Sequence, residues 1–204
     1  MAIVKKFEEV PTTAVSDALK GLNNLDQTIK PVKDDLTVAG RATTVKLRAA
    51  DNKLVLKAIA EANPEDVLVI DAKGYMQNAS CGDFVIGLAE TLGLKGVVID
   101  GAVRDIQGIR DMNYPVFCKG TTTAASDKHG TGEVNGVISC GDTAINPGDI
   151  IVGDADGVVV VPQEDEETIL EKSLEKLEKD EEREEKILGN PEEARKFIMD
   201  QLSK

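Results

Sequence analysis

Apolar residues follow two different spacings along the first 163 residues of the chain. Unbroken apolar runs bounded by polar residues predict two buried strands, at residues 66–71 and 96–100. Apolar residues three and four positions apart predict helices, because such residues share one helical face. These helices are expected at residues 12–22, 52–62, 82–93 and 105–112. The first part of the chain therefore alternates helices with strands.

The later part of the same region contains short strand-like segments without helices between them. Further strands are expected at residues 36–47, 115–119, 133–139, 149–152 and 157–161. Turn residues precede each of the last two segments, as Asn146-Pro147-Gly148 and as Asp154-Ala155-Asp156-Gly157. Alternation followed by a meander of strands predicts an α/β domain with a mixed or barrel-like sheet.

The end of the chain differs from the rest in charge. Residues 164–204 carry a net charge of −7, whereas the preceding 163 residues carry −6. Strong helix formers predict a long helix there, which ends at Asn190-Pro191, and a second helix that follows through Met199. We therefore divide the chain into a core domain, residues 1–162, and an acidic helical extension, residues 163–204.

The long helix of this extension has one narrow apolar stripe, formed by Leu170, Leu174 and Leu177. Residues 178–186 contain no apolar side chain at all. A helix that is polar on every side either projects into solvent or lies across another subunit. The polar pattern leaves both placements open, and we expect the extension at a subunit interface.

The overall composition excludes several classes of protein. A net charge of −13 disfavours direct nucleic-acid binding, because such binding depends on lysine and arginine neutralising phosphates. The chain contains no apolar run of about 18 residues, so no membrane span is predicted. The first residues also lack the apolar core of a signal peptide. A single histidine excludes sites that need two, and the three cysteines are too widely spaced for a CxxC metal site. Cysteine usage suits the cytoplasm, and any metal is expected to have oxygen ligands, as Mg²⁺ and Mn²⁺ prefer.

The polar residues that follow the strand at 96–100 are the strongest candidates for chemistry. In α/β sheets, ligands bind at the carboxyl ends of strands. Arg104 offers a planar pair of donors to a carboxylate or phosphate, and Asp105 offers oxygen ligands to a hard cation. A structural ion pair between Arg104 and Asp105 would explain the same pattern.

A second candidate is the segment Cys81-Gly82-Asp83-Phe84-Val85, at the start of the helix at 82–93. Gly82 exposes backbone N–H groups, which bind anions together with the helix dipole. Asp83 could equally be an ordinary first-turn acid of this helix.

Three other groups are interpreted as structural. The segment at 154–157 lacks the later ligands of a calcium loop and is expected to be a hairpin turn. His129 lies in a polar, glycine-containing run and is interpreted as a surface-loop residue. Cys81, Cys118 and Cys140 lie in apolar surroundings and are interpreted as core thiols.

Residues 81–120, CGDFVIGLAETLGLKGVVIDGAVRDIQGIRDMNYPVFCKG, resemble the core of the RraA-like family. This family includes the regulator of ribonuclease E activity and the 4-hydroxy-4-methyl-2-oxoglutarate/4-carboxy-4-hydroxy-2-oxoadipate aldolases. The resemblance extends from Thr13 to Pro162, and GVVIDGAVRD is a specific part of it. It implies an α/β/β domain with a β-barrel-like core, assembled as a homotrimer or homohexamer with sites between subunits.

The resemblance also implies an activity and a set of site residues. Active members are class II pyruvate aldolases that depend on Mg²⁺ or Mn²⁺ and usually decarboxylate oxaloacetate. Arg104 matches the arginine that binds the substrate, Asp105 matches the metal ligand, and Asp83 matches an acid beside the metal's water shell. The loop that contacts substrate through main-chain N–H groups matches Gly82, Asp83, Phe84 and Val85. An acid of a neighbouring subunit's last helix also approaches the metal, for which the candidates are Asp180, Glu181 and Glu182.

One position departs from the aldolase pattern. Aldolase members carry a further acid three positions after the metal-binding aspartate, where this chain has Gly108, and regulator members lack it too. We expect a metal-dependent lyase acting on short 2-keto acids. One alternative is a non-enzymatic regulator whose acidic surface binds a basic partner such as a ribonuclease. Another is a related lyase or isomerase with a sugar-acid substrate.

Overall fold

The computed structural model describes residues 2–203 and is built around an eight-stranded mixed sheet and a separate two-stranded hairpin. The strands are β1 (Lys30–Pro31), β2 (Val38–Leu47), β3 (Asp66–Cys81), β4 (Gly96–Val103), β5 (Val116–Thr121), β6 (Gly132–Val134), β7 (Ile138–Cys140), β8 (Thr143–Ile145), β9 (Ile150–Asp154) and β10 (Gly157–Val161). The helices are α1 (Ala2–Phe7), α2 (Thr12–Ala18), α3 (Lys53–Glu61), α4 (Asp83–Thr91), α5 (Ile106–Asp111), the 3₁₀ turn η1 (Gln163–Asp165), α6 (Glu166–Ile187) and α7 (Pro191–Leu202).

The sheet has the strand order β1-β5-β4-β3-β2-β9-β10, and β6 also pairs with β2. Strands β5, β4, β3 and β2 are parallel, whereas β9 and β10 are antiparallel. The two ends of the sheet approach each other, since Leu25 N–H donates to the Val158 carbonyl at 2.9 Å and Lys30 Nζ to the Asp156 carbonyl at 2.6 Å. The prediction of an α/β fold with a mixed, barrel-like sheet is confirmed.

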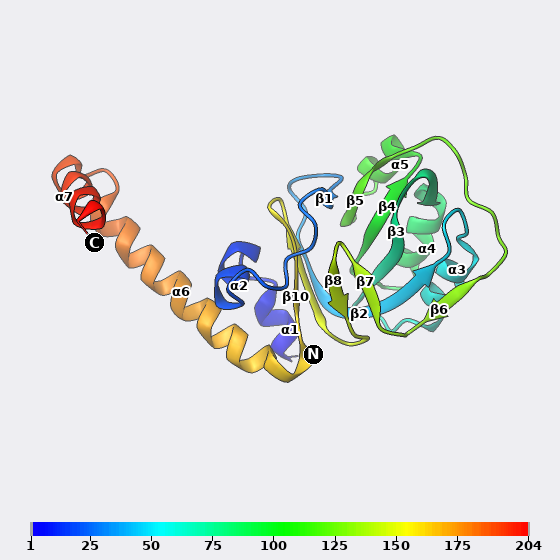
Figure 1. Ribbon diagram of the computed structural model, residues 1–204, viewed down its shortest axis with the longest axis horizontal. Coiled ribbons are helices and arrows are strands. Elements are labelled where there is room, and N and C mark those ends of the chain that lie inside the picture. Colours follow the sequence, from blue (N-terminus) through cyan, green and yellow to red (C-terminus); the bar gives the residue numbers. More distant parts are fainter. Residues whose placement is uncertain (1, 204) are drawn as a thin grey trace.

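Helices cover the sheet in two separate groups (Figure 1). Helices α3, α4 and α5 pack on the parallel strands, and fully buried residues such as Leu68, Ile70 and Ile99 fill the space between them. Helices α1, α2 and the start of α6 pack on β2, β9 and β10. The β7–β8 hairpin covers a third buried cluster around Phe117. The α3–α5 group is the one that borders the ends of β3 and β4.

Several element boundaries differ from the sequence prediction for identifiable reasons. The predicted strand at 133–139 is wrong as a single element, because Asn135 has a positive φ of 55° and turns the chain between β6 and β7. Strand β3 continues to Cys81 rather than ending at Asp71, through three register shifts against β4. Helix α2 stops at Ala18, and Lys20 and Gly21 follow with positive φ values of 57° and 73°.

The C-terminal helices form an extension that projects from the rest of the molecule (Figure 1). Only Ile169, Leu170 and Ser173 of α6 are buried, and Leu174 of the predicted stripe is 47% exposed. The break at Asn190-Pro191 is confirmed, since the Asn190 side chain accepts hydrogen bonds from the first N–H groups of α7. Division into domains at residue 162 stays a prediction. Within residues 2–203, no helix is long and apolar enough to cross a membrane.

Candidate functional site

The two candidate segments meet because β3 and β4 are parallel neighbours that end at the same edge of the sheet. Cys81 is paired with Val103, and the Arg104 N–H donates to the Cys81 carbonyl at 3.0 Å. The turn at 82–83 therefore lies beside the turn at 104–105. Together they border a pocket of about 210 Å³, which is lined by Asn52, Ala79, Cys81, Gly82, Asp83, Phe84, Val85, Arg104, Asp105, Ala125, Ser126 and Lys128.

Gly82 provides the space in which the Arg104–Asp105 pair lies. A Cβ atom at position 82 would collide with the Asp105 carboxylate and come within 3.3 Å of Arg104 Nε. Asp105 itself has a left-handed backbone with φ of 56°, a conformation that is uncommon outside glycine and that aspartate tolerates. Arg104 Nε lies 3.2 Å from Asp105 Oδ2, so the pair is in contact and both side chains remain partly exposed.

Asp83 lies on the first turn of α4 and faces α5. Its Oδ1 accepts the Phe84 N–H at 2.6 Å, so this carboxylate occupies one of the main-chain donors that the family resemblance assigns to substrate. Asp83 Oδ2 lies only 2.5 Å from where a Cβ atom of residue 108 would be. Gly108, the position that departs from the aldolase pattern, thus leaves room for the Asp83 carboxylate.

The cysteine beside this pocket is buried, and burial favours its neutral thiol form. Burial raises the pKa of Cys81 to about 12, and it raises the pKa of Cys118 to about 11. Cys140 is also buried, and its pKa lies well above the ordinary thiol value because of that burial and the nearby Asp100 and Asp71 charges. The interpretation of all three as core thiols is confirmed.

The donor atoms of the pocket fit a hard divalent cation. Asp83 and Asp105 line it together, and carboxylate oxygens are the ligands that Mg²⁺ and Mn²⁺ prefer. In the described part of the chain, no group of three or more His, Cys, Asp and Glu residues is arranged to hold a metal. Mg²⁺ commonly keeps several water ligands and binds proteins through one or two carboxylates.

Part of the pocket comes from residues that sequence analysis did not identify. Asn52 precedes α3, and Ser126 and Lys128 belong to the loop between β5 and β6, yet all three line the pocket. No motif or periodicity marks them, because they reach the pocket only through tertiary folding.

His129, interpreted as a surface residue, is exposed and lies 3.6 Å from Asp127.

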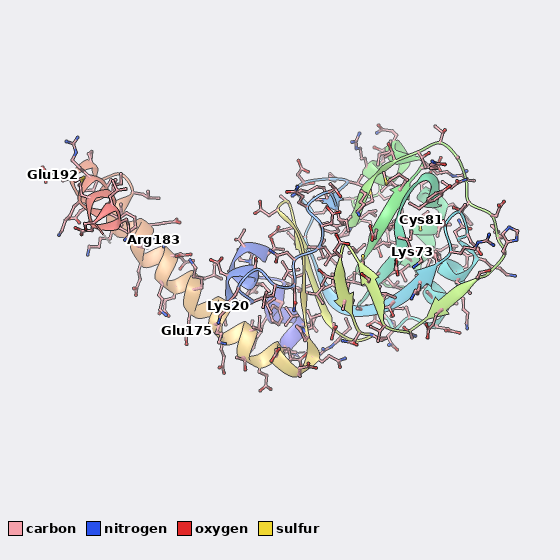
Figure 2. All side chains as sticks on the ribbon, in the orientation of Figure 1. Lys20, Lys73, Cys81, Glu175, Arg183 and Glu192 are labelled. Atoms are coloured by element: carbon pink, nitrogen blue, oxygen red, sulfur yellow. The ribbon has the colours of Figure 1, made fainter. Side chains whose placement is uncertain are left out.

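The other sequence candidates lie elsewhere. Asp154 and Asp156 form the β9–β10 hairpin turn, as predicted, and Asp154 also caps α2 by accepting the Thr12 N–H and hydroxyl. Asp180, Glu181 and Glu182 lie on the projecting half of α6. This part of α6 is remote from Cys81 within the same chain (Figure 2). Any role for them at a site would involve a second subunit.

The fold and the pocket define a class of protein: an α/β protein with a mixed, barrel-like sheet and an arginine–carboxylate pocket at its strand ends. The chain belongs to the RraA-like family, described as Aldolase/RraA, which matches residues 12–160. This membership confirms the family identified from the GVVIDGAVRD segment.

Among the relatives of this chain, one is named as an aldolase and others are named as RraA proteins. A protein of Halalkalibacterium halodurans named "Putative 4-hydroxy-4-methyl-2-oxoglutarate aldolase" is 51% identical over 195 residues, which is 96% of this chain and 93% of the relative. The solved structure of the RNA-processing inhibitor RraA from Thermus thermophilis is 30% identical, with a TM-score of 0.69 over 76% of this chain and 93% of that one. RraAS2 of Streptomyces coelicolor, at 24% identity and a TM-score of 0.81, shares the fold over 91% of this chain and 98% of its own.

Proposed function

We propose that the protein is a divalent-metal-dependent carbon–carbon lyase for short 2-keto acids. In this proposal it is a class II pyruvate aldolase of the 4-hydroxy-4-methyl-2-oxoglutarate/4-carboxy-4-hydroxy-2-oxoadipate type, with oxaloacetate decarboxylase activity. The observation that carries the proposal is the presence of Arg104, Asp105 and Asp83 in one pocket at the ends of two parallel strands. The relative that is 51% identical and named as an aldolase supports it.

The reaction generates negative charge on the substrate, and the positively charged Arg104 can stabilise it. Cleavage of the bond between C3 and C4 of a 4-hydroxy-2-keto acid leaves its electron pair on the pyruvate half as an enolate. The Arg104 guanidinium donates hydrogen bonds to the keto and carboxylate oxygens, and it stabilises the enolate more than the neutral ketone. Arg104 lines the pocket, and its Nε contacts the Asp105 carboxylate at 3.2 Å.

In this mechanism Asp83 moves the proton that the cleavage releases. The 4-hydroxyl must lose its proton as C4 becomes a carbonyl, and the Asp83 carboxylate accepts it directly or through a water molecule. The same proton then returns to C3 and completes pyruvate. Asp105 would hold the divalent cation, with Asp83 beside its water ligands, and the cation would supply Lewis-acid stabilisation of the enolate oxygen when bound.

Release of pyruvate from oxaloacetate in the presence of Mg²⁺ tests this function. Arg104→Ala is expected to reduce the rate about 100-fold, the usual loss when one oxyanion-stabilising donor is removed. Arg110→Ala is the matched control, because Arg110 is exposed on α5 and outside the pocket. Equal rates for the wild type and Arg104→Ala would overturn the proposal.

A regulatory role is the second candidate function. The RraA structure of Thermus thermophilis shares the fold and is named an RNA-processing inhibitor, and Gly108 stands where aldolases carry an acid. The exposed, acidic α6 would meet a basic, arginine-rich partner by charge complementarity. Co-purification of one specific ribonuclease by a protein without measurable turnover would favour this role, and turnover without a specific partner would dismiss it.

We also propose that the protein assembles as a homotrimer or homohexamer with its pockets near the interfaces. Phe84, at the mouth of the pocket, is 75% exposed in the single chain, and an aromatic ring this exposed favours coverage by another surface. A single-chain mass by light scattering at micromolar concentration would contradict this assembly.

A further inference from the structure

One side of the candidate pocket is formed by a loop rather than by a helix or a strand. Residues 122–131, which we call the β5–β6 loop, contribute Ala125, Ser126 and Lys128 to the lining of the pocket. Loops are usually more mobile than the elements that they join. The pocket therefore needs another part of the chain to hold this loop in place.

Asp51, two residues before α3, binds the end of this loop through its carboxylate. The residue is only 3% exposed, and its Oδ2 accepts the N–H groups of Gly130 and Thr131 at 2.8 and 2.9 Å. Its Oδ1 accepts the Lys53 N–H at 3.2 Å. Burial alone would raise the pKa of Asp51, but these three N–H groups outweigh it and lower that pKa. The bonds are therefore made to a charged acceptor, which strengthens them.

Main-chain bonds join the turn around Asp51 to the same part of the loop. The Asn52 N–H donates to the Asp127 carbonyl at 3.0 Å, and the Asp127 N–H donates to the Ala50 carbonyl at 2.8 Å. The Arg48 N–H donates to the Thr131 carbonyl at 3.3 Å. The turn at residues 48–53 therefore lies along residues 127–131 of the loop.

This turn also contacts the strand that leads to Gly82 and Asp83. Asn52 Nδ2 donates to the Ser80 carbonyl at 3.1 Å, next to the last residue of β3. Strand β3 in turn binds the first half of the loop, since the Ala79 N–H donates to the Ala124 carbonyl at 2.8 Å. The turn at residues 48–53 thus connects the β5–β6 loop to the side of the pocket that carries Gly82 and Asp83.

We infer that Asp51 is a positioning residue that holds the β5–β6 loop in place as one side of the candidate pocket. The inference rests on the proposed function. Asp51 itself does not line the pocket, so it acts on the substrate only through the loop. Ordering a loop on binding is unfavourable, and a loop that is already ordered avoids this loss of affinity. Because Arg104 and Asp83 lie outside the loop, loss of Asp51 should weaken substrate binding more than it slows the chemical step.

Steady-state kinetics distinguish this role from a purely structural one. Asp51→Ala is expected to raise KM for oxaloacetate about tenfold and to leave kcat within about threefold of the wild type. Asp51→Asn keeps one oxygen that can accept the N–H groups of Gly130 and Thr131, so it should raise KM only about threefold. A structural defect that only reduces the folded fraction of the enzyme would lower the apparent kcat and leave KM unchanged.

Asp149→Ala is the matched control for this experiment. Asp149 is also 3% exposed, and its carboxylate accepts the main-chain N–H groups of Asn146 at 2.8 Å and Gln163 at 3.2 Å. It lies outside the pocket, so its loss should destabilise the fold without changing KM. An equal KM for the wild type and Asp51→Ala, or the same rise in Asp149→Ala, would overturn the inference. If the alanine variants do not fold, Asp51→Asn and Asp149→Asn are compared instead, and equal KM values for these two would overturn it.

Amide hydrogen exchange, followed by mass spectrometry, tests the role of Asp51 without turnover. Asp51→Ala should accelerate exchange in residues 124–131 about tenfold or more and leave exchange in β4 unchanged, whereas Asp149→Ala should leave the loop as it is in the wild type. If the wild type releases no pyruvate from oxaloacetate with Mg²⁺ present, the proposed function fails, while faster exchange confined to the loop still supports the assigned role of Asp51. Unchanged exchange of the loop in Asp51→Ala would overturn that role.

Discussion

The core and the C-terminal extension of this protein are organised by different forces. In the core, every residue of β4 is buried, and the largest side chains are fully enclosed. In the extension, α7 has no buried residue, and α6 is buried only near its start. The labelled Glu175, Arg183 and Glu192 lie along a rod that points away from the core (Figure 2). Burial thus fixes the core, whereas helix propensity and local charge pairs maintain the extension, most of whose surface is exposed.

Ion pairs show the same contrast. In the core, Lys119 Nζ lies 2.9 Å from Asp26 and 2.8 Å from the buried Asp100, and it links two parts of the chain that are distant in sequence. In the extension, Lys176 pairs with Asp180 one helical turn away at 2.6 Å. An exposed pair of this kind is screened by salt and adds little stability. Pairs in the core therefore organise tertiary structure. In the extension, Lys176 also reaches Asp17 of α2 at 3.3 Å, whereas the Lys179–Glu175 and Arg183–Asp180 pairs join residues of α6 alone.

The largest difference in stability between the core and the extension is expected when one large apolar side chain is removed from each. Phe117 is fully buried, and Phe117→Ala should lower the free energy of unfolding by about 3–5 kcal/mol, through lost burial and the cavity that remains. Ile198 of α7 is 55% exposed, so Ile198→Ala should change it by less than about 0.5 kcal/mol. Urea denaturation followed by circular dichroism measures both values. Similar losses for the two variants would contradict the contrast.

A change at the pocket should reduce activity strongly without affecting stability. Gly82→Ala places a methyl group against the Asp105 carboxylate, so we expect pyruvate release to fall about 100-fold, as when an oxyanion-stabilising donor is lost. Its backbone φ of −121° suits alanine, so the unfolding midpoint should not change. Gly87→Ala, inside the helix α4 that follows Gly82, is the control, because its Cβ would meet only Met112 at an ordinary 3.5 Å. A Gly82→Ala enzyme of normal activity would show that the Asp105 carboxylate is not needed where it lies.

Acidification should remove more of the free energy of unfolding through the Lys119–Asp26 pair of the core than through the Lys176–Asp180 pair of the extension. The Thr28 N–H and the Lys119 ammonium lower the pKa of Asp26 from 3.8 to about 2. Because its folded pKa is depressed, Asp26 stabilises the fold above about pH 4 and loses this effect as the pH falls through 2. Asp26→Asn should therefore lower stability by about 1 kcal/mol at pH 7 and make progressively less difference as the pH falls toward 2.

The control for that experiment is Asp180→Asn in the extension. The Lys176 ammonium lowers the pKa of Asp180, but the pair is exposed, so we expect no measurable loss of stability in 0.15 M salt. The two variants are compared by urea denaturation at pH 7, 4 and 2.5. If the difference in unfolding free energy between Asp26→Asn and the wild type stays constant from pH 7 to pH 2.5, the assigned role of Asp26 is wrong.

The smallest effect on the core is expected from shortening the chain. Truncation after Leu177 keeps the buried Ile169 and Leu170 and removes the projecting helix, so the core should unfold at nearly the same urea concentration. If the extension packs on a neighbour, the same truncation should lower the mass in solution, as measured by light scattering. An unchanged mass would place the subunit interface elsewhere.

The sequence predicted the site residues that lie at strand ends. Gly82, Asp83, Arg104 and Asp105 follow two apolar runs, and parallel strands bring such positions together by a general rule. Asn52 and Lys128 could not be predicted in this way, because the hydrogen bonds of Asp51 that join their segments span about 80 residues of the chain. The division of 133–139 was missed although Asn135-Gly136 is a turn signal, because the apolar residues on both sides suggested one strand.

By itself, the sequence determined the α/β class, the family and the charged character of the two ends of the chain. These follow from local patterns: apolar spacing, the GVVIDGAVRD segment and the distribution of acids. Only the tertiary structure decided that Asp83 fills the space left by Gly108 and that Lys128 joins the Arg104 pocket. The physical reason is that both facts depend on contacts between segments whose separation in space no local pattern encodes.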